Sequence, residues 1–234
     1  MKTRYGFTLS ELIVALAIIG IIAAITVPSL VQHYQKDLQV TMLKKVYKDL
    51  RDNIDKMQTE NITGDFKSSR IGSTSPDIEG FFDDYYNINK KCGADTAQCL
   101  ASTYKNLNKD TINPATLIRE GTYCALLKDG VALCISPQLV IHTYGPGGLY
   151  LENFGPAFVT VDINGPDKPN IAGRDLFTFS IWDDYSIDVV NPDQIAAGTA
   201  QEDRETMFEE DCRSSYDGAA CFGKILNDNW KMNY

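Results

Sequence analysis

The chain of 234 residues contains few histidines and no closely spaced pair of cysteines. His33 and His142 are its only histidines, and no C-x-x-C occurs among its six cysteines. Structural zinc sites draw on these ligand types at short spacing, so zinc binding is not expected. No G-x-S-x-G motif occurs either, and no serine, histidine or aspartate stands in a setting that marks a nucleophile. The sequence therefore does not predict an enzyme.

Positive charge is also scarce. The 22 lysines and arginines stand against 31 aspartates and glutamates, which gives a net charge of −9. An acidic surface repels the phosphate backbone of nucleic acids at long range. No stripe of basic and aromatic residues interrupts this pattern. Nucleic acid is therefore not favoured as a partner, and the composition fits a solvated external surface.

Charge of either sign is missing from one long stretch near the N-terminus. Residues 12–27 carry no charged side chain, and from residue 7 to residue 31 the only one is Glu11. At 1.5 Å per residue, a helix over residues 7–31 reaches the ~30 Å thickness of a bilayer core. Lys2 and Arg4 precede this stretch. The positive-inside rule therefore places the N-terminus in the cytoplasm and the rest of the chain outside.

Two residues stand out in this apolar stretch. A charged side chain at the centre of a membrane helix costs roughly 2.5–3.5 kcal/mol on insertion scales, so Glu11 requires a partner. A protonated carboxyl, or a polar contact to another transmembrane helix, is the alternative explanation for Glu11. Pro28 removes a helical hydrogen bond and can kink or locally melt the helix.

The N-terminal motif has a specific order. Residues 6–11 read G-F-T-L-S-E, the apolar run follows, and Pro28 comes near its end. Gly6 directly precedes Phe7, and Glu11 is the fifth residue when Phe7 is counted as the first. This segment resembles the prepilin leader of type IV pilins and type II secretion pseudopilins.

The resemblance implies cleavage after Gly6 by a prepilin peptidase, N-methylation of Phe7, and assembly with other pilin subunits into a helical filament. The freed amine of Phe7 is positive, and Glu11 of a neighbouring subunit can neutralise it. In this family, a proline at the place of Pro28 is linked to loosening of the helix on assembly. We therefore expect Phe7, Glu11 and Pro28 to act in assembly.

The same resemblance implies a route. The chain is expected to wait in the bacterial inner membrane as a single-pass protein, with its N-terminus cytoplasmic and its head outside. The lipid bilayer is its first partner, and an inner-membrane assembly platform then moves it into an extracellular or periplasmic filament.

Behind the apolar run the helix is expected to continue as an amphipathic stem. We expect a leader at 1–6, a transmembrane and assembly helix at 7–31, a stem at 32–58 and a globular head at 59–234. The stem's apolar residues recur mostly at three- and four-residue steps, and the head's sheet is expected to cover them. They are Val31, Tyr34, Leu38, Leu43, Val46, Tyr47, Leu50, Ile54 and Met57.

The head is expected to be built on an antiparallel sheet. Asp129-Gly130 between two apolar runs, 122–128 and 131–136, is a strong hairpin signal. The fold class predicted is therefore α+β and pilin-like, with a long N-terminal helix on an antiparallel sheet. Further strands are expected at 139–144, 158–163, 176–181 and 186–190, helices at 77–86, 201–212 and 219–230, and an irregular segment at 90–114.

All six cysteines lie outside the apolar run, which favours an oxidising compartment and disulfides. Six cysteines allow fifteen pairings, so connectivity stays open at this point. Cys124 and Cys134 are symmetric about Asp129, as facing positions on a hairpin would be. The residues fall in three local couples, of which the outer two would close short loops: Cys92/Cys99, Cys124/Cys134 and Cys212/Cys221.

The segment 162–175 is rich in oxygen-bearing side chains. Hard cations such as calcium take several oxygen ligands from one flexible loop. Asp162, Asn164, Asp167 and Asp175 are therefore candidate calcium ligands. The spacing matches no full EF-hand, and no glutamate closes the loop. The favoured interpretation is that Asx side chains cap turns shaped by glycine and proline.

The function expected is that of a structural subunit of a type IV pilus or a type II secretion pseudopilus. The head is larger than expected of an abundant major pilin, which indicates a minor subunit. The alternative is a pilin-anchored adhesin or ligand-binding head, with calcium as a candidate ligand. An anchored enzyme is the third and least supported hypothesis.

Overall fold

The computed structural model describes residues 6, 8–73, 75–137, 140–144, 150–154, 156–189 and 199–234, the side chains of 140–144 and 150–154 excepted. The chain divides into two compact units, Met1–Leu38 and Gln39–Tyr234. The helix α1, Leu9–Glu60, contributes residues to both units.

In the first unit, α1 carries an apolar surface that the chain does not cover. An 18-residue window of this helix has a mean hydropathy of 2.6, and none of it is buried. A helix that is apolar on every side is typical of a membrane span. No other helix in the described residues has the length and composition to cross a membrane. The predicted apolar N-terminal helix is confirmed.

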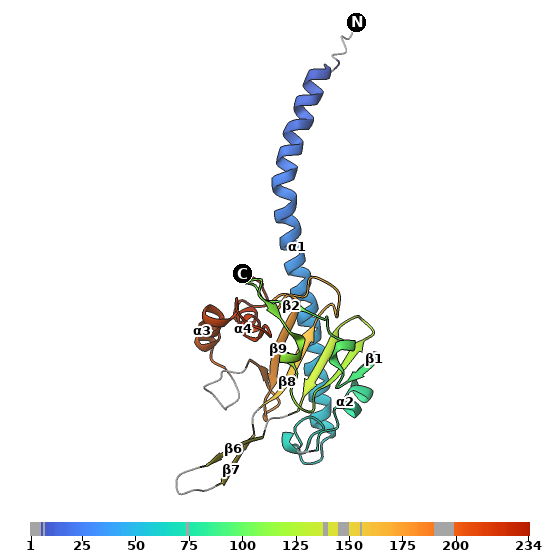
Figure 1. Ribbon diagram of the computed structural model, residues 1–234, viewed down its shortest axis with the longest axis vertical. Coiled ribbons are helices and arrows are strands. Elements are labelled where there is room, and N and C mark those ends of the chain that lie inside the picture. Colours follow the sequence, from blue (N-terminus) through green and yellow to red (C-terminus); the bar gives the residue numbers. More distant parts are fainter. Residues whose placement is uncertain are drawn as a thin grey trace. The chain divides into compact units, whose positions relative to one another are not determined.

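In the second unit, residues 39–60 of α1 lie along one face of a β-sheet (Figure 1). The predicted stripe is confirmed from Leu43 onward. Val31, Tyr34 and Leu38 are instead exposed, by 45%, 63% and 44% respectively. The helix also ends at Glu60, beyond the expected Met57. The α1 side chains buried against the sheet are Val40, Leu43, Val46, Leu50, Ile54 and Met57.

The sheet has six strands in the order β1-β4-β5-β8-β9-β10, and every neighbouring pair is antiparallel. The Asp129-Gly130 turn joins β4 to β5 as predicted, and Cys124 faces Cys134 across the pair. The strands are β1, Ile88–Gly93; β4, Tyr123–Leu127; β5, Ala132–Ser136; β8, Ala157–Asp162; β9, Leu176–Ile181; and β10, Ile187–Asp188.

Smaller elements surround the sheet. Two hairpins, β2–β3 and β6–β7, pair only within themselves among the described strands. Three short helices follow the stem in sequence, and α4 packs on β9. The hairpin strands are β2, Tyr104–Lys105; β3, Thr111–Ile112; β6, Val140–Tyr144; and β7, Tyr150–Phe154; the helices are α2, Ile78–Tyr85; α3, Gln201–Asp211; α4, Ala219–Asn227; and the 3-10 turns Phe66–Ser68, Thr96–Gln98 and Pro114–Leu117.

Several predicted boundaries were wrong. The expected irregular segment 90–114 contains most of β1, the hairpin β2–β3 and a 3-10 turn. The helix expected at 219–230 ends at Asn227, because Asn229 and Trp230 have φ values of 52° and 61°. The strand expected at 139–144 is seen as β6, and the strand expected at 186–190 is seen as β10. Residues 139 and 190 lie outside the described residues.

Both faces of the sheet are covered, by different parts of the chain. Leu133, Val159 and Phe179 face α1 and form one core with it. Because side chains alternate along a strand, the intervening residues face the other way. There Cys134 and Leu176 form a second core with Tyr104 and other residues of the segment between β1 and β4. This alternation explains why β5, β8 and β9 are buried along their whole length.

Candidate functional site

The predicted cleavage junction lies immediately before α1. Gly6 is exposed, and Phe7 lies outside the described residues. A Cβ atom added at Gly6 would meet no atom within 4 Å. No packing contact among the described residues requires glycine here, and cleavage after Gly6 stays a prediction.

Glu11 has a partner within its own helix. Its carboxylate oxygen Oε2 accepts hydrogen bonds from the backbone N–H and the hydroxyl of Thr8, each at 2.8 Å. The backbone N–H of Glu11 donates in return to Thr8 Oγ1 at 3.3 Å. This reciprocal arrangement is a capping box, which satisfies N–H groups at the start of a helix. The T-x-x-E spacing of Thr8 and Glu11 is the sequence signature of this motif, although the cap was not among the predicted features.

Pro28 does not interrupt α1. The helix is continuous from Leu9 to Glu60 with Pro28 inside it. Two residues earlier, the hydroxyl of Thr26 donates to the carbonyl oxygen of Ile22 at 2.9 Å. Proline still leaves one helical carbonyl without its usual N–H partner, so this stretch is a weak point of the helix. Loosening at Pro28 on assembly stays a prediction.

The six cysteines form three disulfides, each between two cysteines that are seven to ten residues apart in sequence. The pairs are Cys92–Cys99, Cys124–Cys134 and Cys212–Cys221. The first ties β1 to the following 3-10 turn, the second links β4 to β5 across the hairpin, and the third closes the loop between α3 and α4. Each crosslink therefore holds a local loop in the head, in agreement with an oxidising compartment.

The candidate calcium ligands are spread along the β8–β9 connection. Asp162 and Asp175 are fully buried, and protein groups already occupy their oxygens. Tyr104 donates its hydroxyl to Asp162 Oδ2 at 2.5 Å, and the N–H of Asn164 donates to Oδ1 at 3.3 Å. The N–H of Asn170 donates to Asp175 Oδ2 at 2.6 Å. The bond from Asn164 to Asp162 is an Asx-type turn cap, as in the favoured interpretation, and the other two bonds join residues that are further apart in sequence.

The other two candidates do not converge with them. The Asn164 side-chain amide donates to the backbone carbonyls of Asp167 and Lys168, and the Asp167 side chain is exposed. Among the residues that the structure describes, no group of three or more His, Cys, Asp or Glu side chains could hold a metal ion. The loop thus has no ready-made cation site in the described ranges.

Burial changes the acidity of the two enclosed carboxyls. It raises the pKa of Asp162 to about 8 and the pKa of Asp175 to about 6, because a charge is poorly solvated inside the protein. The hydrogen bond from Tyr104 acts against this rise at Asp162. Burial next to Asp162 also raises the pKa of the Tyr104 hydroxyl. Both carboxyls are thus buried groups that accept hydrogen bonds from the backbone of the loop.

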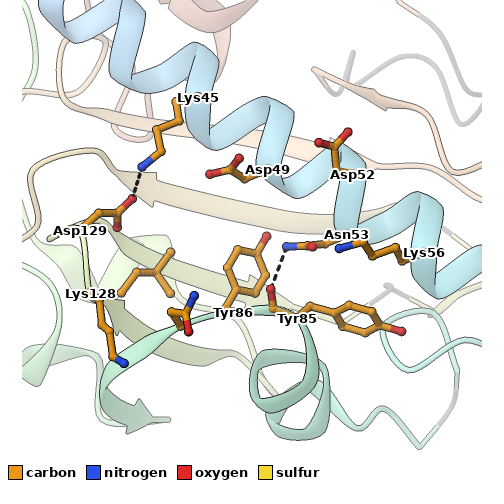
Figure 2. Close-up of a pocket in the computed structure, with 11 residues that line it drawn as sticks. Lys45, Asp49, Asp52, Asn53, Lys56, Tyr85, Tyr86, Lys128 and Asp129 are labelled. Atoms are coloured by element: carbon orange, nitrogen blue, oxygen red, sulfur yellow. Dashed lines mark hydrogen bonds and ion pairs between the residues drawn. The ribbon is translucent and has the colours of Figure 1, made fainter.

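A groove of about 430 Å³ runs beside the stem in the second unit (Figure 2). One wall is the α1 segment from Lys45 to Lys56, and the other joins the end of α2 to the β4–β5 turn. Lys45 Nζ contacts Asp129 Oδ2 at 2.7 Å, and the Asn53 side-chain amide donates to the carbonyl of Tyr85 at 3.2 Å. Lysines and aspartates both line the groove, so neither sign of charge dominates it.

The two histidines and the two tryptophans are not among the described residues that line this groove. His33 lies within α1, and the side chain of His142 lies outside the described residues. Trp182 is 2% exposed, and the ring of Trp230 packs on Tyr47 with centroids 5.1 Å apart. The two tryptophans therefore serve core packing.

Comparison with known proteins bears on the N-terminal segment. Residues 1–27 match the prokaryotic N-terminal methylation motif. No curated protein matches the chain, and no solved structure does. The chain thus carries, at the N-terminal end of a pilin-like α+β fold, a methylation motif that is typical of type IV pilins and type II secretion pseudopilins. That class consists of structural rather than catalytic subunits.

Proposed function

We propose that this chain is a minor structural subunit of a type IV pilus or a type II secretion pseudopilus. The methylation motif implies a pilin- or pseudopilin-like filament subunit that a prepilin peptidase processes. Together with the apolar helix, it fits insertion into the inner membrane before assembly. The observation that carries the proposal is the overlap of this motif, residues 1–27, with the uncovered first part of a 52-residue helix.

In this proposal, the peptidase cuts between Gly6 and Phe7, and Phe7 is N-methylated. The subunit then leaves the bilayer when its apolar side chains pack against those of its neighbours. Exposed residues such as Leu12, Ile18 and Ile22 supply this surface. Lipid tails are as apolar as these side chains, so close packing and buried polar contacts must favour assembly.

Glu11 has a specific part in this scheme. Its carboxylate holds Thr8 in the isolated subunit, and cleavage creates a positive amine one residue before Thr8. A carboxylate in an apolar filament core needs a cationic partner. We propose that the Phe7 amine of the adjacent subunit provides it, while Pro28 allows the helix to adjust.

The mass of the intact protein tests the processing step. Protein extracted from membranes should lack residues 1–6 and carry one additional methyl group. A chain that still begins at Met1, or one cut beyond Ala24, would contradict the pilin interpretation, because an ordinary secretory signal is removed after its apolar region.

A pilin-anchored adhesin or ligand-binding head is the second candidate function. One observation favours it, namely a preformed pocket of about 470 Å³ on the head. The two functions are compatible, because a filament subunit can present such a pocket on its surface.

A further inference from the structure

A pocket of about 470 Å³ opens on the face of the sheet that α1 does not cover. Its floor is formed by Phe158 of β8 and by Thr178 and Ser180 of β9, which alternate with residues that face α1. The volume lies in the range of small-ligand sites, about 300–1,000 Å³. These three floor residues are themselves buried, so a ligand would be contacted mainly by the walls.

The loop between α3 and α4 forms one wall, and several bonds hold it in place. The Cys212–Cys221 disulfide closes the loop. Within it, the Ser215 hydroxyl donates to Asp217 Oδ1 and accepts the N–H of Gly218, each at 2.9 Å. A wall that is already ordered loses little conformational entropy when a ligand binds.

Arg119 lies above the floor. Its guanidinium carbon stands 3.5 Å from the centroid of the Phe158 ring, which fits a stacked cation–π arrangement. Within the described part of the chain, Arg119 takes part in no salt bridge. The stacking fixes the plane of the guanidinium, so its N–H groups are oriented donors.

Three further residues of the lining are polar or aromatic, namely Tyr216, Asp211 and Asp217. Tyr216 is 50% exposed, which is unusual for a large ring in this head. Asp211 is exposed at the end of α3, and Asp217 lies deeper in the same wall. The pocket therefore presents a ring, a cation and two carboxylates, together with the hydroxyls of Ser214 and Tyr216.

This combination points to one class of ligand. Every hydroxyl of a sugar can both donate and accept a hydrogen bond, and the pocket offers fixed donors, fixed acceptors and hydroxyls. The apolar C–H face of a sugar ring can cover an exposed aromatic ring, and burial of that area is favourable. One cation beside two carboxylates gives no advantage to a strongly charged ligand. A neutral ligand with many hydroxyls fits best.

We propose that this pocket binds a neutral sugar unit of a glycan. Tyr216 packs against the sugar ring, Arg119 donates to its oxygens, and Asp211 and Asp217 accept from its hydroxyls. The proposal concerns the head alone, so it does not depend on how the N-terminal helix assembles.

Binding of the full chain to an array of neutral, sialylated and sulfated glycans tests this. The protein should be kept in a polyoxyethylene detergent, because sugar-based detergents would compete. We expect binding to neutral hexose or N-acetylhexosamine glycans. Tyr216→Ala and Arg119→Met should each weaken it by on the order of tenfold, as for a central contact residue.

Matched variants separate binding from folding. Tyr216→Phe keeps the ring and should retain binding, and Ile62→Ala removes another exposed apolar side chain that does not line the pocket. Urea unfolding of each variant checks that the head is intact. The proposal is overturned if no neutral glycan binds, if only acidic glycans bind, or if neither Tyr216→Ala nor Arg119→Met weakens binding.

Discussion

The hydroxyl of Tyr104 donates a 2.5 Å hydrogen bond to the buried carboxylate of Asp162, which lies 58 residues further along the chain. Tyr104 also accepts a hydrogen bond of 3.0 Å from the N–H of Ala101. The bond joins the segment between β1 and β4 to the end of β8, inside the second core of the head.

This pair predicts a pH-dependent stability. Burial raises the folded-state pKa of Asp162 from 3.8 to about 8. The folded state therefore keeps a proton that the unfolded state loses, so this contribution to the free energy of unfolding is complete below about pH 4 and declines up to about pH 8. Asp175 adds a decline of the same sign up to about pH 6.

This decline can be measured by urea unfolding at several pH values from 4 to 8. The fluorescence of Trp182 and Trp230 monitors the unfolding. Asp162→Asn cannot titrate, so its free energy of unfolding should fall less steeply with pH than that of the wild type. Asp167→Asn is the matched control, because that aspartate is exposed in the same loop. Parallel curves for the wild type and Asp162→Asn would contradict the argument.

Variants of Glu11 separate its two roles. Glutamine can occupy the same position of a capping box, whereas alanine cannot. If charge pairing drives assembly, Glu11→Gln and Glu11→Ala should both be cleaved but should both enter filaments poorly. Thr8→Ala removes the cap and keeps the charge, at a cost of about 1 kcal/mol in helix stability. Incorporation is measured by immunoblots that compare the amount of each variant in sheared filaments with the amount in the membrane fraction. Normal incorporation of Glu11→Gln would show that only the cap matters.

Gly165 should tolerate no side chain. Its φ is +64°, and an added Cβ would lie 2.6 Å from the carbonyl oxygen of Gly130. Gly64 has a similar φ of +66° but no atom within 4 Å of an added Cβ. Gly64→Ala should therefore lower the free energy of unfolding by only the roughly 1–2 kcal/mol that the left-handed conformation costs. Gly165→Ala should lower it clearly more. Equal free energies of unfolding for the two variants would mean that the β4–β5 turn moves away at little cost.

Calcium should not stabilise the head. The oxygens of Asp162 and Asp175 accept hydrogen bonds from the protein, and Asp167 points its charge into water. A ligand at a hundred times its Kd would add about 2.7 kcal/mol and raise the midpoint of thermal unfolding. We expect no shift of that midpoint with millimolar calcium. A rise that is lost in Asp175→Asn would instead support the calcium-binding alternative.

The edge strand β1 shows why part of the fold could not be predicted. It reads Ile88-Asn-Lys-Lys-Cys-Gly and lacks alternating apolar residues, because its outer side faces water. Lysines are common on such edges, where they discourage pairing with other chains. Only its pairing with β4 makes the segment a strand.

Features that depend on residues close in sequence could be predicted from the sequence alone. The uncovered apolar helix, the hairpin at Asp129-Gly130 and the methylation motif each follow from periodicity, turn chemistry or residue order over a short stretch. The glycan pocket and the Tyr104–Asp162 bond do not. The pocket combines Arg119, Phe158 and Tyr216, and the bond joins Tyr104 to Asp162. These contacts exist only because the sheet, the disulfide-closed loop and the segment between β1 and β4 meet in three dimensions. No local sequence pattern predicts these contacts between distant segments, because burial of the whole core supplies the free energy that holds the segments together.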